Sequence, residues 1–205
     1  MARLKTLAFH DLTAVYGDRT VLDHVSGSVR QKEILAVTGC SGCGKTTLLN
    51  LISGAARHQP GGDIDIDGGA VFDRDLYYAV CGEPLMAGLS VRDNLRMVRT
   101  AYRNEAGDID GVLKRLGIGH CGGNYPGRLS SGEYKRALLA CALISGAPFL
   151  LLDEPTSNLD PVSGKAIANC LKWAAGSDRR GIIVATHDPD IVAVAGSELK
   201  LGKTT

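Results

Sequence analysis

The stretch Gly39-Cys40-Ser41-Gly42-Cys43-Gly44-Lys45-Thr46-Thr47 decides the fold of this chain of 205 residues. It contains the pattern Gly-x-x-x-x-Gly-Lys-Thr, preceded by an apolar run at Ile34 to Thr38 and followed by a helix-like run from Thr47 to Ser53. A position between a strand and a helix is the context that a phosphate-binding loop requires. Glycines let backbone N–H groups approach phosphate without a clash, and the helix start adds a favourable dipole. The stretch therefore predicts a phosphate site, with a plain glycine-rich turn as its alternative.

The last residues of this stretch suit the chemistry of a nucleotide. Lys45 would bring a cation to the β and γ phosphates, and Thr46 would place a hydroxyl on Mg²⁺. The predicted small-molecule ligands are therefore ATP and Mg²⁺.

A second apolar run, Phe149-Leu150-Leu151-Leu152-Asp153-Glu154, ends in two carboxylates. As a buried parallel strand it would put Asp153 at the carboxyl edge of the sheet, where ligands bind. Asp153 would then hold the metal, directly or through water, and Glu154 would polarise an attacking water. The alternative is that both carboxylates belong to a surface turn before Pro155. The phosphate loop favours the metal and water roles over this alternative.

Further runs predict alternating strands and helices. Tyr77 to Cys81 and Gly181 to Thr186 are apolar and typical of buried parallel strands. Asp160 is a good N-cap and Pro161 suits the first helical position, so a helix is expected from Pro161 to Ala175.

A helical insert is predicted at about residues 88–129. Ser90 begins a capping-box pattern and a helix that runs to about Thr100. A second helix follows Asp108, a plausible cap, and stops at Gly117.

The N-terminal part is more β-like. From Leu4 to Val29 the segments are short, with Gly17 and Gly27 as breaks, and in 61–69 Ile64 and Ile66 alternate with aspartates. These segments predict an antiparallel layer beside the main sheet.

Composition excludes several classes of protein. Charged residues make up 22% and hydrophobic residues 44%, which is ordinary for a globular protein, and a net charge of +1 gives no electrostatic reason to expect nucleic acid as a partner. The longest apolar stretch, Ala137 to Ile144, is far shorter than the roughly 20 residues that span a bilayer. Met1 to Phe9 has no signal-peptide pattern, so a cytoplasmic location is expected.

The six cysteines are expected to be reduced thiols. Cys40 and Cys43 form a Cys-x-x-Cys, but no second pair has the spacing of a zinc site. Oxidation or alkylation of these two thiols would block nucleotide binding, because both flank backbone that must approach phosphate. The favoured alternative is that Cys40 and Cys43 serve only as small side chains that fill space in the loop.

Four further segments follow the order found in the ATP-binding cassette (ABC) family, which the chain resembles over nearly all its residues. Leu129-Ser130-Ser131-Gly132-Glu133 is similar to the signature motif, and Arg136 occupies the basic position that follows it. Ser157-Asn158-Leu159-Asp160 resembles the family's loop after the strand that ends in the two carboxylates. His187 resembles the switch histidine, and Tyr16 resembles the aromatic residue that stacks on adenine. Taken alone, these segments have purely structural alternatives: a helix cap for Ser130 and Ser131, a strand end for His187 and a core residue for Tyr16.

The resemblance implies a fold and a set of site residues. The fold class is α/β, a P-loop NTPase core with a mainly parallel sheet, an antiparallel β layer and an α-helical subdomain, all in one nucleotide-binding domain over 1–205. The implied catalytic residues are Lys45, Glu154 and His187, and the implied metal ligands are Thr46 and Asp153. The implied nucleotide-binding residues are Tyr16, Gly39, Cys40, Ser41, Gly42, Cys43, Gly44, Lys45, Thr46, Thr47, Ser130 and Gly132.

The family's mechanism implies a second cassette, in a homodimer or a heterodimer. Ser130 and Gly132 of one subunit would act on the γ phosphate held by the other, and hydrolysis would release the clamp. Such a dimer would drive separate transmembrane permease subunits at the inner face of a membrane, with the helical insert making the contact.

Two positions depart from the family's pattern. Gly82 stands where the family has a glutamine that contacts the metal and reports on the membrane partner, with Glu83 as one substitute. Ser131 and Glu133 stand where Gly and Gln are commonest.

Two rival functions remain beside transport. A soluble ABC ATPase acting on ribosomes or DNA usually has tandem cassettes or long coiled coils, and neither is present in this chain. A nucleotide-binding partner with reduced turnover is suggested by Gly82, but Lys45, Asp153, Glu154 and His187 argue against it.

Overall fold

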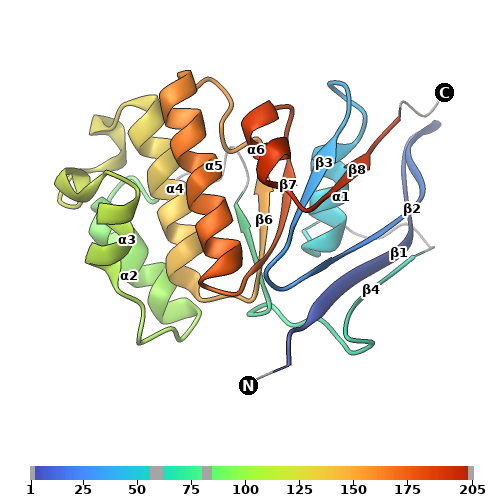
Figure 1. Ribbon diagram of the computed structural model, residues 1–205, viewed down its shortest axis with the longest axis horizontal. Coiled ribbons are helices and arrows are strands. Elements are labelled where there is room, and N and C mark those ends of the chain that lie inside the picture. Colours follow the sequence, from blue (N-terminus) through green and yellow to red (C-terminus); the bar gives the residue numbers. More distant parts are fainter. Residues whose placement is uncertain (1–2, 56–61, 80–84, 203–205) are drawn as a thin grey trace.

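The computed structural model describes residues 3–55, 62–79 and 85–202. Their centre is a parallel sheet of five strands in the order β5-β6-β7-β3-β8 (Figure 1). The strands are β3 (Ile34–Thr38), β5 (Leu76–Ala79), β6 (Phe149–Asp153), β7 (Gly181–Ala185) and β8 (Ser197–Lys200). β3 and β6 have the predicted bounds, and β7 ends one residue earlier than predicted. The predicted strand at Tyr77 begins at Leu76, and its last two residues lie outside the described residues.

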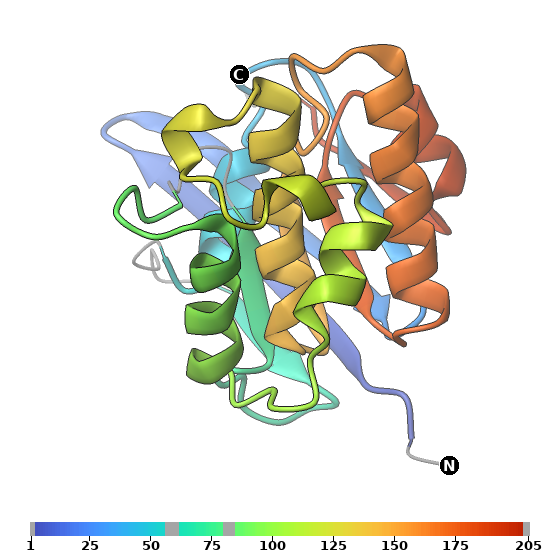
Figure 2. The same ribbon diagram turned by 90° about the vertical axis from the view of Figure 1, so that its left-hand side faces the viewer.

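The sheet is buried on both faces, as alternating side chains of β6 show. Leu150 and Leu152 belong to the core between the sheet and helices α4 (Ser131–Ser145) and α5 (Pro161–Gly176), whereas Phe149 and Leu151 belong to the core on the opposite face. The first face is covered by α4 and α5, and α2 (Val91–Ala101) and α3 (Ile109–Arg115) pack against α4. The second face is covered by α1 (Lys45–Ile52) and an antiparallel sheet, so the molecule is layered (Figures 1 and 2).

The antiparallel sheet has the order β2-β1-β4 and confirms the predicted second β layer. Its strands are β1 (Thr6–Tyr16), β2 (Arg19–Arg30) and β4 (Asp63–Ile66). Gly17, at φ +60°, makes the turn between β1 and β2. The prediction that Gly27 breaks a strand was wrong, because Gly27 lies inside β2. A Cβ there would come 2.6 Å from the ring of Phe9, so this glycine makes room for a core aromatic side chain.

Helix caps predicted from sequence are formed. Ser90 accepts a hydrogen bond from the Asp93 N–H at the start of α2, and Asp108 caps α3 in the same way. Asp160 accepts from two N–H groups at the start of α5, where Pro161 is the first helical residue. Between α3 and α4 lie two short 3₁₀ helices, η1 (Gly119–Cys121) and η2 (Pro126–Arg128).

Besides the two 3₁₀ helices, two short elements after β7 were not predicted. The helix α6 (Pro189–Val194) and the edge strand β8 complete the fold after β7. β8 has only four residues, Ser-Glu-Leu-Lys, and therefore lacks the apolar run of a buried strand. Within the described residues, no helix has the length and apolar character needed to cross a membrane.

Candidate active site

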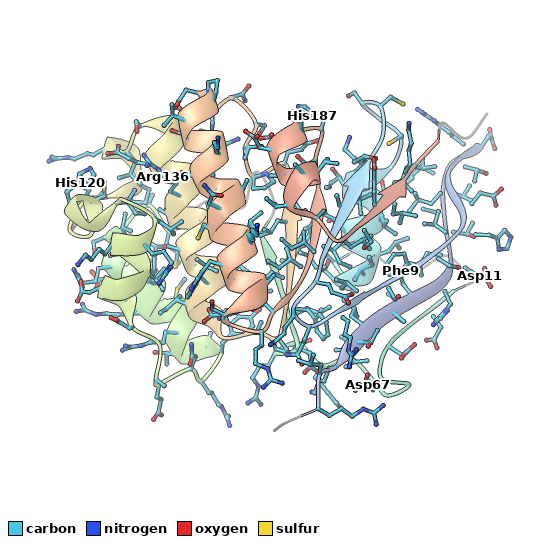
Figure 3. The ribbon with its side chains drawn as sticks, viewed as in Figure 1. Phe9, Asp11, Asp67, His120, Arg136 and His187 are labelled. Atoms are coloured by element: carbon cyan, nitrogen blue, oxygen red, sulfur yellow. The ribbon has the colours of Figure 1, made fainter. Side chains whose placement is uncertain are left out.

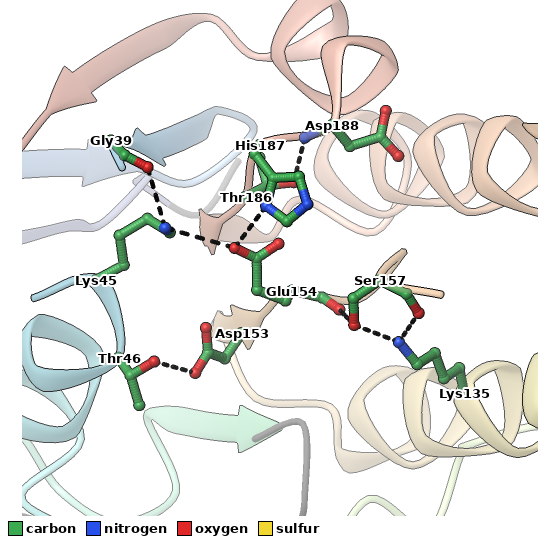
Figure 4. A network of polar contacts seen from close by, with 10 residues as sticks. All are labelled: Gly39, Lys45, Thr46, Lys135, Asp153, Glu154, Ser157, Thr186, His187 and Asp188. Carbon is green, nitrogen blue, oxygen red and sulfur yellow. Dashed lines mark hydrogen bonds and ion pairs between the residues drawn. The ribbon is translucent and has the colours of Figure 1, made fainter. Parts of the chain in front are cut away.

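Three adjacent parallel strands bring one group of the predicted site residues together. Because β6, β7 and β3 are neighbours and point the same way, the segments that follow them meet at one edge of the sheet. Asp153 ends β6, His187 follows β7, and the loop 39–44 follows β3. Figure 4 shows the resulting network of polar contacts.

The phosphate loop depends on glycine at two close approaches. Gly39 has φ +145°, and a Cβ there would come 2.5 Å from the backbone oxygen of Leu201. Gly44 has φ +102° and is the N-cap of α1, where no side chain caps the helix and no acidic residue lies in the first turn. The first N–H groups of α1 therefore have neither a side-chain cap nor a competing carboxylate, which suits an anion.

Lys45 is held over this loop. Its Nζ donates a hydrogen bond to the Gly39 carbonyl at 3.2 Å and lies 3.6 Å from Oε1 of Glu154. Only 10% of the side chain is exposed, so the ammonium group is fixed between the loop and the end of β6. This position suits a cation that neutralises phosphate charge.

Thr46 and Asp153 form the second pair. The Thr46 hydroxyl donates to Oδ2 of Asp153 at 2.7 Å, while Oδ1 of Asp153 is buried without a hydrogen-bond partner. Burial raises the pKa of Asp153, the Thr46 hydrogen bond opposes that rise, and the charge of Glu154 adds to it. A hydroxyl beside a buried, half-satisfied carboxylate fits a divalent cation with oxygen ligands.

Glu154 and His187 form the third pair. His187 Nδ1 lies 3.0 Å from Oε1 of Glu154, and the backbone N–H of Glu154 donates to the Ala185 carbonyl at 2.9 Å. Glu154 has φ +48°, a conformation that a non-glycine residue adopts only when its surroundings fix it. The carboxylate is thereby placed between Lys45 and the imidazole (Figure 4).

An open cavity of about 300 Å³ lies beside these groups. Its lining combines the loop with both carboxylates, namely Val21, Ser41, Gly42, Gly44, Lys45, Thr46, Thr47, Asp153 and Glu154. Cys40 is exposed and Cys43 is buried, and neither lines the cavity. The structure thus brings together the phosphate loop, the predicted metal ligands and the predicted base.

Lys135, which the sequence did not single out, connects this site to α4. Its Nζ donates to both the carbonyl and the hydroxyl of Ser157, and the Ser157 hydroxyl donates to the Glu154 carbonyl at 3.0 Å. The sequence offered one signal, a lysine directly before the basic position Arg136.

The signature residues are not brought to the phosphate loop of the same chain. Ser130 caps α4, and Gly132 lies in its first turn; α4 covers the opposite face of the sheet from α1. Neither residue lines the cavity, and neither does Tyr16, which is exposed at the end of β1. Gly82 and Glu83 lie outside the described residues.

The geometry defines an α/β protein with a phosphate loop, a cation, a half-satisfied carboxylate and a candidate base, which is the class of the P-loop ATPases. Comparison with known proteins agrees. Residues 22–157 match the family model described as "ABC transporter". A solved structure described as the ATP binding subunit of an ABC transporter superposes with a TM-score of 0.81 at 23% identity, over 96% of this chain and 86% of that chain, which supports the fold.

Several curated relatives cover most of the chain. The lipoprotein-releasing system ATP-binding protein LolD of Chromohalobacter salexigens is 34% identical, over 89% of this chain and 84% of its own length. The aliphatic sulfonates import ATP-binding protein SsuB 2 of Burkholderia cenocepacia is 32% identical, over 90% of this chain and 69% of its own length. The chain belongs to the ABC transporter family and is an ATP-binding, ATP-hydrolysing subunit of that family.

Proposed function

We propose that the loop 39–44 and the start of α1 bind the phosphates of ATP. Backbone N–H groups of the loop and of the first helical turn would hold the phosphate oxygens, with Lys45 on the β and γ phosphates. Cys40, Cys43 and Thr47 would contribute through the backbone of this stretch. Tyr16, exposed at the end of β1, would stack on the adenine ring. The uncapped start of α1 under the Lys45 ammonium group supports this placement.

Thr46 and Asp153 would hold Mg²⁺. The observation that supports this is the buried Oδ1 of Asp153, which has no hydrogen-bond partner and lies on the same carboxylate as the oxygen that Thr46 contacts. When bound, the ion supplies positive charge that stabilises the phosphoryl group during transfer. The side chains of Thr46 and Asp153 would set its place beside Lys45.

Glu154 would act as the general base. A water molecule attacks the γ phosphorus, the bond to the oxygen that bridges the β and γ phosphates breaks, and the water's proton passes to Glu154. His187 would orient the water and the γ phosphate, since its Nδ1 lies 3.0 Å from the same carboxylate oxygen. This adjacency of Glu154, His187 and Lys45 carries the proposal most directly.

The active form would be a dimer of cassettes, either with a second copy or with a related subunit. Ser130 and Gly132 lie at the start of α4, away from their own phosphate loop, and are therefore available to the nucleotide of a partner. Their helix start would complete the γ phosphate site in trans. Hydrolysis would remove that shared contact and open the dimer.

The dimer would drive separate permease subunits from the inner face of a membrane. The relatives named above include an import protein and a releasing-system protein, both described as ATP-binding components. In this proposal the chain is one nucleotide-binding domain over 1–205, and residues of about 88–129 form a helical subdomain that contacts the permease.

Dimer formation gives a direct test. The Glu154→Gln variant of the full chain, which should bind ATP but hydrolyse it slowly, is measured by light scattering with and without MgATP. We expect a dimer only with MgATP. Adding Gly132→Asp should keep the protein monomeric, because a carboxylate would face the partner's phosphates, while the same charge favours the start of α4 and so preserves the fold.

Gly176→Asp is the control for an added charge elsewhere, since a Cβ at Gly176 would meet no atom within 4 Å outside its own helix and its chain neighbours. It should leave the ATP-dependent dimer intact. A protein that stays monomeric in saturating MgATP without Gly132→Asp, or a dimer that Gly132→Asp does not disturb, would contradict the proposal.

A further inference from the structure

A cluster of three different ligand types lies between η1 and the start of α4, away from the cavity at the phosphate loop. Nε2 of His120 lies 3.0 Å from Oε1 of Glu133, and the Cys121 thiol donates to the same oxygen at 3.3 Å. The ligand atoms of all three residues lie within 4.8 Å of one another. Figure 3 shows His120 at the far end of the helical part, distant from His187.

We propose that His120, Cys121 and Glu133 form a binding site for a divalent transition-metal ion of the Zn²⁺ type. One imidazole nitrogen, one thiolate sulfur and one carboxylate oxygen are the ligands such an ion prefers. In a tetrahedral zinc site, adjacent ligand atoms are about 3.4–3.6 Å apart, as follows from zinc–ligand distances of about 2.0–2.3 Å. The contacts of Glu133 with His120 and Cys121, at 3.0 and 3.3 Å, need only small side-chain adjustments to reach that spacing. The ligand atoms of His120 and Cys121 lie within 4.8 Å of each other and would have to close on the ion.

Burial fixes the Cys121 thiol, and the exposure of His120 leaves an entry path. Cys121 is fully buried in the helical core, whereas the side chain of His120 is 67% exposed and that of Glu133 is 23% exposed. An ion could therefore enter from the His120 side, and its fourth position would face solvent. A water molecule there would complete the tetrahedron.

The supporting contacts orient Glu133 for this role. Its other oxygen, Oε2, accepts hydrogen bonds from the Ser130 N–H and the Ser130 hydroxyl, each at 2.8 Å. These bonds hold the carboxylate in one orientation, with Oε1 facing His120 and Cys121. Hydrogen bonds to the ligands orient them in the same way in known metal sites. Cysteine spacing alone did not predict the cluster, because Glu133 comes 12 residues after the thiol and is of another ligand type.

Spectroscopic titration of the full chain with Co²⁺ tests the site independently of ATP. Cobalt bound to thiolate has a charge-transfer absorption band. We expect one such site per chain, with the band lost when Zn²⁺ displaces cobalt. Cys121→Ala should abolish the band. His120→Ala should weaken Co²⁺ binding by more than about 10-fold, because losing a ligand costs more than losing a residue that only supports a ligand.

Glu133→Gln keeps a residue that can form the capping box with Ser130, so α4 should remain capped while metal affinity falls. Cys170→Ala, which changes a buried thiol elsewhere, and His24→Ala, which changes an exposed imidazole elsewhere, are the controls and should bind Co²⁺ like the wild type. No thiolate band in the wild type would overturn the proposal. A band of unchanged strength in Cys121→Ala would also overturn it, because the thiolate would then come from another cysteine such as Cys40.

Discussion

Nδ1 of His187 lies 3.0 Å from Oε1 of Glu154, although the two residues are 33 positions apart in the sequence. They meet because β7 is the neighbour of β6 in the sheet and both strands end at the same edge. The imidazole of His187 thereby lies beside the carboxylate that we propose as the base.

His187→Ala should lower ATP turnover by about 100-fold, because the water and the γ phosphate lose an orienting group. The free energy of unfolding should change by less than about 0.5 kcal/mol, since exposed side chains contribute little to stability. Steady-state ATPase assays and chemical denaturation measure both. His24→Ala is the matched control, with a side chain 75% exposed against 72% for His187. Equal losses of turnover in both variants would contradict the assigned role.

Asp153→Asn should reduce the gain in ATP affinity that Mg²⁺ provides by about 10-fold or more, as expected for a weakened metal site. Calorimetric titration with ATP, with and without Mg²⁺, measures that gain. A variant whose affinity still rises with Mg²⁺ as in the wild type would argue against Asp153 as a ligand.

The same variant carries a pH prediction. Burial raises the pKa of Asp153 in the folded protein, so its contribution to stability is present at low pH and is lost as pH rises through the raised pKa. The free energy of unfolding of the wild type, measured relative to Asp153→Asn without ligands, should therefore fall as the pH rises above the ordinary aspartate pKa value of 3.8. A difference that rises with pH would contradict a carboxylate whose burial outweighs its hydrogen bond from Thr46.

Gly39→Ala should destabilise the protein by about 3 kcal/mol, because it combines a strained backbone with overlap in a packed region. The Cβ would come 2.5 Å from the Leu201 carbonyl oxygen and 2.6 Å from Cys43 Sγ. Gly42→Ala meets no atom within 4 Å but keeps a φ of +75°, so about 1 kcal/mol is expected. Urea denaturation compares them, and equal losses would show that the close approach at Gly39 does not matter.

The parallel core and most of the site were predictable from sequence because each was encoded locally. Ile34–Thr38 and Phe149–Asp153 are continuous apolar runs, and a strand buried on both faces needs little else to be recognised. Gly27 misled the prediction because its role is tertiary: it makes space for Phe9 on the neighbouring strand. The contact of Lys135 with Ser157 and the cluster around Glu133 were also missed, since both join segments whose proximity only the fold decides.

Thiol reagents should react first at Cys40 among the five cysteines that the structure describes. Cys40 is exposed, whereas Cys43 is buried, and burial raises the pKa of Cys121 to about 11 and that of Cys141 to about 12. Maleimide labelling followed by peptide mapping should find Cys40 modified, and ATP should slow the reaction. If labelled protein bound ATP with undiminished affinity, the hypothesis that modification of this loop blocks nucleotide binding would be wrong. Cys40→Ser, which lacks this thiol, is the control.

We propose Glu154 as the base for ATP hydrolysis. Turnover of the Glu154→Gln variant, compared with the wild type in the same assembled complex, tests it most directly. Glutamine keeps the size of the side chain but cannot accept the proton, so we expect turnover to fall by about 100-fold or more while ATP is still bound. Unchanged turnover in Glu154→Gln would show that Glu154 is not the base.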